Sequence, residues 1–75
     1  MQIKILGSGC KNCKKLYANV VLAADELKLD VEVTKVTDFQ EIAKYNVMQT
    51  PALVIDELVV AKGRVLTIQE IKKLL

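Results

Sequence analysis

The apolar residues of this chain change their spacing after the first six positions. In residues 1–6 (MQIKIL), Ile3 and Ile5 alternate with Lys4, which is the two-residue period of a β-strand. After the turn Gly7-Ser8-Gly9 the apolar positions follow helical spacing, at Cys13, Leu16, Tyr17, Val20, Ala24 and Leu27. We expect this helix to end near Leu29-Asp30. A strand that leads through a short turn into an amphipathic helix is a typical opening unit of an α/β fold.

A second strand and a short helix are expected next. Residues 31–36 (VEVTKV) are rich in β-branched side chains and begin with alternation, which favours a strand with one solvated face. Asp38 with Glu41 three residues later resembles a capping box, with aspartate in the cap position. We therefore expect a short helix that begins there and covers Phe39, Ile42 and Ala43.

A β-hairpin is predicted after the only proline. Pro51 disfavours helix at the residue before it and opens an apolar run over residues 52–55. The acidic pair Asp56-Glu57 separates this run from a second one, residues 58–61, and Gly63 ends the hairpin.

The chain ends in a predicted helix with a clear start signal. Thr67 and Glu70 form a capping box, and Leu66 is placed to pack against Ile71. Four residues of this helix are expected to face the sheet: Ile68, Ile71, Leu74 and Leu75.

The predicted order is therefore β-α-β-α-β-β-α in a single α/β domain over residues 1–75. The right-handed crossover rule makes the first two strands parallel. The hairpin then completes a mixed four-stranded sheet with helices on both faces. Ligands of such sheets bind where the first strand passes into its helix, and Cys10 and Cys13 lie at that place.

Composition excludes several kinds of function. The chain has no histidine and no tryptophan, and aromatic residues make up 4% of it. A histidine-dependent catalytic triad, a histidine metal centre and an aromatic base-stacking platform are thus excluded. The net charge of +2 is too small to indicate nucleic acid or an anionic membrane as a partner. No apolar run approaches the ~20 residues of a membrane span, and the first one is too short for a signal peptide, so we expect a cytoplasmic protein.

The two cysteines are the remaining candidates for chemistry. Residues three apart in the first turn of a helix have Cβ atoms about 5–6 Å apart, which is compatible with a disulfide. A purely structural disulfide is not expected in the cytosol, where thiols are kept reduced. A helix N-terminus stabilises a thiolate, and Cys10 lies at that terminus. Cys13 begins the apolar stripe, so we expect it to be less exposed.

These positions predict a mechanism of thiol–disulfide exchange. The Cys10 thiolate attacks a partner's disulfide, and Cys13 then attacks the mixed disulfide and releases the reduced partner. The first 24 residues hold four lysines and no acidic residue, which favours the thiolate. Lys11, between the cysteines, is the candidate for tuning the pKa of Cys10. Lys14 and Lys15 are equally well explained as a solvated helix face.

Taken together, the cysteine pair, the helix it opens and Thr50-Pro51 resemble the thioredoxin-like superfamily. The chain looks most like its small single-domain thioredoxin/glutaredoxin-like redox proteins of archaea and anaerobic bacteria, and the resemblance covers Ile3 to Lys73. It implies that Pro51 is a cis-proline beside the cysteines and that the backbone of Thr50 contacts substrate. It also implies that the protein is a disulfide oxidoreductase that takes part in electron transport and cell redox homeostasis. Its redox group would be the Cys10–Cys13 disulfide, and no cofactor is expected. The expected partners are disulfide-containing proteins and an upstream reductase, such as a flavin-dependent one, and the expected state is a monomer.

The sequence departs from the best-known members of that superfamily at several positions. Thioredoxins have Trp before the first cysteine and Gly-Pro between the two, whereas this chain has Gly9 and Lys11-Asn12. Their buried acid six residues before the first cysteine is replaced by Lys4. The Gly-Gly turn and acid with which glutaredoxins hold glutathione are replaced by Gly63-Arg64. The identity of the electron donor, a reductase or glutathione, is therefore left open.

Four other functions are considered for this region of the chain. A soft-metal module could hold Cu(I) with the Cys10/Cys13 pair, but small copper chaperones run β-α-β-β-α-β and carry a methionine before the first cysteine. A structural zinc site needs four ligands, and one chain supplies two sulfurs, so such a site requires a dimer that shares four cysteines. A dinucleotide site at Gly7-Ser8-Gly9 lacks its third glycine, which would stand at Asn12. A non-catalytic interaction module is disfavoured by the presence of both cysteines.

Overall fold

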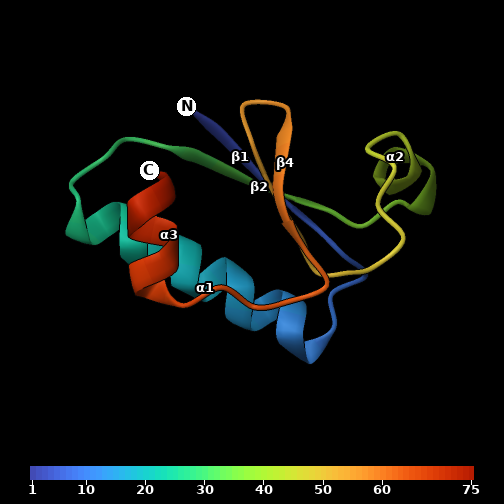
Figure 1. Ribbon diagram of the computed structural model, residues 1–75, viewed down its shortest axis with the longest axis horizontal. Coiled ribbons are helices and arrows are strands. Elements are labelled where there is room, and N and C mark those ends of the chain that lie inside the picture. The colour runs from blue at the N-terminus through green and yellow to red at the C-terminus, as the bar shows by residue number, and fades with distance from the viewer.

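The computed structural model describes residues 1–75, and its elements follow the predicted order (Figure 1). The strands are β1 (Gln2–Leu6), β2 (Glu32–Val36), β3 (Ala52–Ile55) and β4 (Leu58–Lys62). The helices are α1 (Lys11–Glu26), α2 (Phe39–Ala43) and α3 (Ile68–Leu74). No helix is both long enough and apolar enough to cross a membrane.

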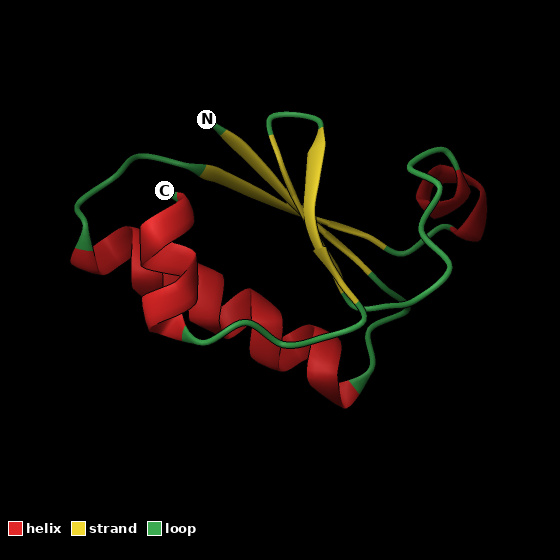
Figure 2. Cartoon of the chain, viewed as in Figure 1, coloured by secondary structure: helices red, strands yellow, loops and turns green.

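The four strands form one mixed sheet in the order β2-β1-β3-β4 (Figure 2). Strands β1 and β2 are parallel, as expected for a crossover through α1. Strand β3 is antiparallel to β1 and forms the predicted hairpin with β4. The expected four-stranded mixed sheet is confirmed.

Each face of the sheet has its own apolar core. The core under α1 and α3 comprises Ile3, Ile5, Leu16, Val20, Ala23, Leu53, Leu66 and Ile71. The opposite face packs against α2 and the loop after it, with Leu6, Ile42, Val47, Ala52 and Val54. Figure 1 shows α1 and α3 side by side and α2 well apart from them. Because alternate residues of β1 and β3 enter different cores, the expectation of helices on both faces is confirmed.

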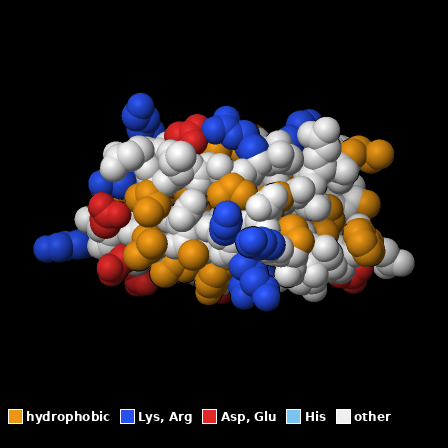
Figure 3. Space-filling view, turned by 90° about the horizontal axis from the view of Figure 1, so that it is seen from below, with side chains coloured by type: hydrophobic (Ala, Val, Ile, Leu, Met, Phe, Trp, Pro, Cys, Tyr) orange, Lys and Arg blue, Asp and Glu red, His pale blue; other side chains and the backbone are white.

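Both helices of the first core deviate from the predicted apolar stripes near their ends. Helix α1 ends earlier than expected, because Lys28 takes a positive φ of 55°, and Leu27 is 37% exposed. Leu74 was predicted to face the sheet but is 44% exposed. The buried line of α3 runs through Ile68, Ile71 and Leu75, which places Leu74 on the other side of Ile71. Figure 3 views the molecule from below relative to Figure 1, and on this face exposed apolar side chains lie among charged ones.

The two predicted helix caps have different outcomes. In α3 the capping box is present: Glu70 N–H donates to Thr67 Oγ1 (3.1 Å), and Thr67 N–H donates to Glu70 Oε1 (3.0 Å). In α2, Asp38 caps the helix as predicted, but its Oδ1 accepts from the backbone N–H of Gln40. The capping box expected with Glu41 is absent, because the Glu41 carboxylate pairs with Lys44 instead. Of the residues predicted along α2, only Ile42 is buried.

The turn between β3 and β4 is held by two sets of polar contacts. Asp56 and Glu57 both have positive φ (48° and 70°), the geometry of a type I′ hairpin turn. Asp56 exchanges hydrogen bonds with the backbone of Gln2. The Lys4 ammonium donates to Glu57 Oε1 and to the Tyr45 hydroxyl (2.7 Å each), and that hydroxyl donates to Glu57 Oε2 (3.0 Å). Non-glycine residues thus occupy a strained turn because neighbouring side chains fix them.

We predict that Glu57 makes the stability of the fold sensitive to acid. Hydrogen bonds from Lys4 and Tyr45 hold the pKa of the Glu57 carboxyl below its ordinary value. The stability that this group contributes is therefore fully present above the unfolded pKa of about 4.3 and is lost as pH falls through the folded one. In urea unfolding, Glu57→Gln should have a lower midpoint than the parent at pH 7, and the gap should close towards pH 2. The exposed Glu32, which has no ion pair, gives the control Glu32→Gln. A gap that stays constant across this range would contradict the prediction.

Candidate active site

Cys10 and Cys13 stand together where β1 passes into α1. Cys10 is the N-cap of α1, with extended backbone (φ −67°, ψ 170°), and its Sγ accepts a hydrogen bond from the Cys13 N–H (3.3 Å). The sulfur thus takes the place that a serine or aspartate oxygen holds in other caps. Both cysteines are free thiols; Cys10 is exposed, whereas Cys13 is 6% exposed. An outer and an inner thiol lie as the sequence predicts.

The environments of the two thiols shift their pKa values in opposite directions. The pKa of Cys10 is lowered by a hydrogen bond from the Cys13 thiol and by the backbone N–H groups of Cys13 and Asn12. The pKa of Cys13 is raised by burial and by its hydrogen bond to Cys10. Hydrogen bonds to the charged form favour it and desolvation disfavours it, so the first proton is lost from Cys10. The sulfur that is exposed to partners is therefore also the one whose thiolate form is favoured.

Gly7 provides the space that the inner thiol occupies. A Cβ atom on Gly7 would overlap Cys13 Sγ and would lie 3.8 Å from Thr50 Cβ. Gly9, by contrast, has open space around it but a φ of +87°, which favours glycine. The sequence placed both glycines in the turn that aims Cys10 and missed the packing role of Gly7. Only the fold shows that Gly7 lies between Cys13 and Thr50.

The peptide bond between Thr50 and Pro51 is cis, as the resemblance implies for this pair. Pro51 is buried, and its carbonyl accepts a hydrogen bond from the Gly63 N–H (2.8 Å), which ties it to the end of β4. Thr50 is exposed, and its side chain approaches the same space beside Gly7 as the Cys13 sulfur. The structure therefore brings Thr50 to the inner thiol and leaves it accessible to a docked chain.

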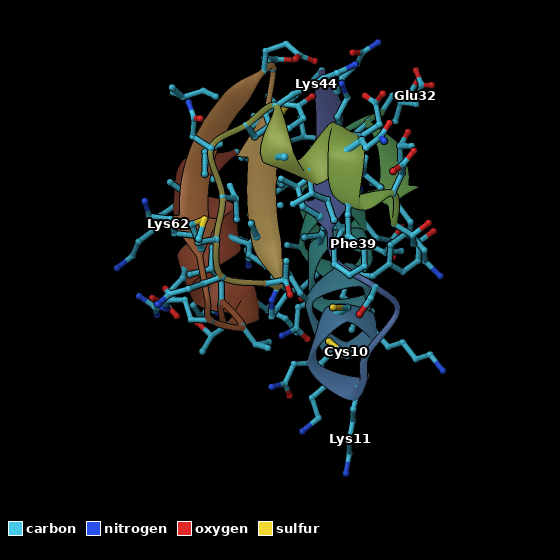
Figure 4. All side chains as sticks on the ribbon, turned by 90° about the vertical axis from the view of Figure 1, so that its right-hand side faces the viewer. Cys10, Lys11, Glu32, Phe39, Lys44 and Lys62 are labelled. Carbon is cyan, nitrogen blue, oxygen red and sulfur yellow. The ribbon has the colours of Figure 1, made fainter.

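Neither Lys11 nor Lys4 is hydrogen-bonded to a cysteine sulfur. Lys11 extends from the start of α1 away from Cys10 (Figure 4), and no hydrogen bond or ion pair involves it. The lowered pKa of Cys10 has its sources in Cys13 and the backbone. Lys4, which replaces the buried acid of thioredoxins, is bound by Tyr45 and Glu57. Tuning of Cys10 by Lys11 stays a prediction.

A pocket opens beside the inner thiol on the side of β2. It has a volume of about 50 Å³ and is lined by Ile5, Gly7, Gly9, Cys13, Lys14, Lys35 and Thr37. No carboxylate lines it. No cluster of three or more His, Cys, Asp or Glu residues suited to a metal ion exists in the chain, so the soft-metal alternative has two sulfurs as its donor set. Nothing in the local sequence around Lys35 indicates a site. Its place at the pocket follows from the pairing of β2 with β1.

We predict that Gly7→Ala disturbs the inner thiol specifically. Its new methyl group must displace Cys13 Sγ, and overpacking of this kind typically costs about 1–3 kcal/mol. Gly9→Ala is the matched control, because it strains the backbone by about 1–2 kcal/mol without touching the Cys13 sulfur. Urea unfolding should show both losses, whereas the rate at which Cys13 is alkylated should change only in Gly7→Ala. Equal Cys13 reactivity in the two variants would contradict the packing role of Gly7.

A four-stranded sheet in this order, with two thiols at the start of the helix after its first strand and a cis-proline peptide beside them, defines the class of thioredoxin-fold redox domains. A family model described as a thioredoxin domain matches residues 1–75, and the chain belongs to that family of disulfide oxidoreductases. Two relatives, each named thioredoxin, come from archaea. The protein of Methanocaldococcus jannaschii is 42% identical over 71 residues, covering 95% of this chain and 81% of its own length. That of Methanothermobacter thermautotrophicus is 37% identical over 75 residues, covering 100% of this chain and 97% of its own length.

Proposed function

We propose that this thioredoxin-family protein reduces or exchanges protein disulfides through its Cys10/Cys13 dithiol. The observation that carries the proposal is the contrast between the two sulfurs. Cys10 is exposed at the helix N-cap with a lowered pKa, whereas Cys13 is buried behind it with a raised pKa. Cys10 can therefore attack the disulfide of a partner. Cys13 is inaccessible to partners but close enough to attack Cys10.

The reaction follows in two exchanges. The Cys10 thiolate attacks one sulfur of the partner's disulfide; a Cys10–partner disulfide forms, and the other partner sulfur leaves as a thiolate that solvent protonates. Cys13 then loses its proton and attacks Cys10 Sγ, which breaks the bond to the partner and forms the Cys10–Cys13 disulfide. The partner has gained two electrons and two protons, and the dithiol has lost them. An upstream reductase, for which a flavin-dependent enzyme is the candidate, restores the dithiol.

The surface around Cys10 suits a protein partner. Phe39 and Cys10 lie at the same end of the molecule in Figure 4, and Phe39 is 75% exposed. Met48, two residues before the cis peptide bond, is 96% exposed. Exposed apolar side chains on the surface of a redox domain are candidate contacts for an extended segment of another protein, and the backbone of the exposed Thr50 can pair with such a segment. We further propose that the protein works as a cytoplasmic monomer, without nucleic acid or membrane partners.

Reduction of insulin by limiting dithiothreitol tests the activity, because the freed insulin chains precipitate. The parent protein should accelerate precipitation, and the double variant Cys10→Ser/Cys13→Ser should match the rate with dithiothreitol alone. A parent protein with no acceleration over that background would refute the proposal. Replacing dithiothreitol with NADPH and a flavin-dependent reductase, or with glutathione, identifies the class of donor.

A further inference from the structure

The small net charge of +2 conceals an uneven distribution of charge along the molecule. Glu32 of β2 pairs with Gln2, the first residue of β1, and Asp56 exchanges hydrogen bonds with the backbone of that same residue. Asp25 and Glu26 form the end of α1, from which the chain runs directly into β2. The acidic residues at this end of the molecule, where β1 begins, are Asp25, Glu26, Asp30, Glu32, Asp56 and Glu57. The end opposite to the cysteines is therefore rich in carboxylates.

The other end of the sheet, where β1 ends and the cysteines follow, carries lysines. Lys35 of β2 pairs with Ile5, and Lys62 of β4 pairs with Ala52, which pairs in turn with Leu6. Helix α1 begins at this end, and its first residues (KNCKK) add further lysines. All these lysines are exposed, and we refer to them as the lysine surface: Lys11, Lys14, Lys15, Lys35 and Lys62.

The lysine surface is not neutralised by carboxylates of the protein. The ion pairs of the chain join Lys4 to Glu57, Lys44 to Glu41, Arg64 to Glu70 and Lys72 to Glu26. None of them involves a member of the lysine surface. Asp38, which follows β2 and has no ion pair, caps α2 through its Oδ1. Free ammonium groups therefore outnumber free carboxylates at the end of the molecule where the cysteines lie.

Cys10 lies within the lysine surface. Its carbonyl accepts a hydrogen bond from the Lys14 N–H (3.0 Å), and Lys11 follows it directly at the start of α1. Lys14 also lines the pocket beside Cys13. The partial positive charge of the helix N-terminus adds to that of the ammonium groups. A molecule that reacts with Cys10 must therefore enter a region of positive potential.

We propose that the lysine surface selects partner proteins whose reactive disulfide is flanked by acidic residues. A segment that bears carboxylates relieves the mutual repulsion of the lysines when it docks, whereas a basic segment adds to that repulsion. Because the surface surrounds the attacking sulfur, the ligand that fits both its charge and its chemistry is an acidic polypeptide segment with a disulfide. This inference rests on the proposed function and adds a class of substrate to it.

The lysines act on the encounter and leave the chemical step unchanged. The Cys10 thiolate attacks one partner sulfur, and the other sulfur leaves with the electron pair of the broken bond. Complementary charge raises the concentration of a partner at the thiol, by about tenfold or more at low ionic strength. At about 1 M salt the Debye length is about 3 Å, so exposed charges no longer attract a partner over this distance. The preference should therefore be large at low salt and small at high salt.

Cyclic peptides that differ only in the residues flanking one disulfide test this preference. The flanking residues are Glu, Gln or Lys in otherwise identical sequences. Reduced protein is mixed with each peptide and quenched with acid, and mass spectrometry measures the reduced peptide. At about 20 mM salt the Glu peptide should be reduced about tenfold faster than the Lys peptide, with the Gln peptide between them. At about 1 M salt the rates should agree within about twofold.

The double variant Lys14→Gln/Lys62→Gln tests whether the lysine surface causes the preference. Lys28→Gln/Lys73→Gln is the matched control, since both of its lysines are exposed, have no ion pair and lie at the acidic end, beside the Lys72–Glu26 pair or just after α1. The ratio of the Glu to the Lys peptide rate cancels any change in the reactivity of Cys10 itself. At low salt this ratio should fall by about two- to fourfold in Lys14→Gln/Lys62→Gln and by less in the control.

The outcomes separate the inference from the proposed function. Equal rates for the Glu and Lys peptides at low salt would overturn the inference while the proposed function stands. A control variant that lowers the ratio as much as Lys14→Gln/Lys62→Gln does would also overturn it, because net charge alone would then explain the preference. If the parent protein reduced none of the peptides, the proposed function would fail and the inference would fail with it.

Discussion

Replacing Cys13 with serine should convert the protein from a turnover catalyst into a trap for its partners. Cys10 keeps its position at the helix N-cap and still attacks, but no neighbouring thiol can open the mixed disulfide. Intramolecular attack acts at an effective concentration far above that of millimolar external thiol. We therefore expect the rate of insulin reduction to fall on the order of a hundredfold or more, with the Cys10–partner complex accumulating. Non-reducing electrophoresis and intact mass measure that complex.

Cys10→Ser is the matched variant, since it removes the other sulfur of the same pair. It should lose turnover without forming a mixed disulfide, because Cys13 is buried and its pKa is raised. Circular dichroism should show that both variants are folded. A Cys13→Ser protein that accumulates no mixed disulfide, or a Cys10→Ser protein that traps partners, would contradict the assignment of roles.

The second large effect is the selectivity of alkylation. With limiting iodoacetamide at pH 7, Cys10 should react on the order of ten- to a hundredfold faster than Cys13, because it is exposed and has the larger thiolate fraction. Its rate should rise with pH and level off at a lower pH than that of an ordinary cysteine, since its pKa is lowered. Lys11 lies between the cysteines, so cleavage after lysine places them in separate peptides for mass spectrometry.

The same assay tests the role that the sequence assigned to Lys11. If Lys11 tunes Cys10, then Lys11→Gln should move the Cys10 profile towards higher pH. Because its side chain extends away from the sulfur, we expect a smaller displacement than Cys13→Ala causes by removing the hydrogen-bonding thiol. Preferential alkylation of Cys13, or equal rates for the two cysteines, would contradict the nucleophile assignment itself.

The sequence predicted the order of the elements because each carries its own local signal. The alternating residues of β1, the helical stripe of α1 and the Thr67 cap of α3 all act within a few residues, and all are present in the structure. The cysteines were found for the same reason, since two thiols three residues apart at a helix start require no knowledge of the rest of the chain. The cis bond before Pro51 came from family resemblance, because the local sequence alone gives cis a prior of only about 5–6%.

What escaped prediction depends on residues distant in the chain. Gly7 is needed because the Cys13 sulfur packs against it, and Lys35 comes to line the pocket beside Cys13 only through the register of β2 with β1. Glu41 was expected to complete the capping box of Asp38 but pairs with Lys44, and Leu74, expected to face the sheet together with Leu75, is 44% exposed. In each case the local sequence is compatible with more than one contact, and the packing of the folded chain decides which contact forms.

The central claim is that Cys10 and Cys13 form one redox couple. Equilibration in buffers of graded dithiothreitol redox ratio, followed by acid quenching, thiol alkylation and intact mass, measures it directly. The account predicts two species only, one with both thiols alkylated and one with neither, interconverting in a single two-electron transition. Mutation of either cysteine should abolish the transition. Accumulation of a species with one free thiol, or protection of the two thiols at different redox ratios, would contradict a shared disulfide.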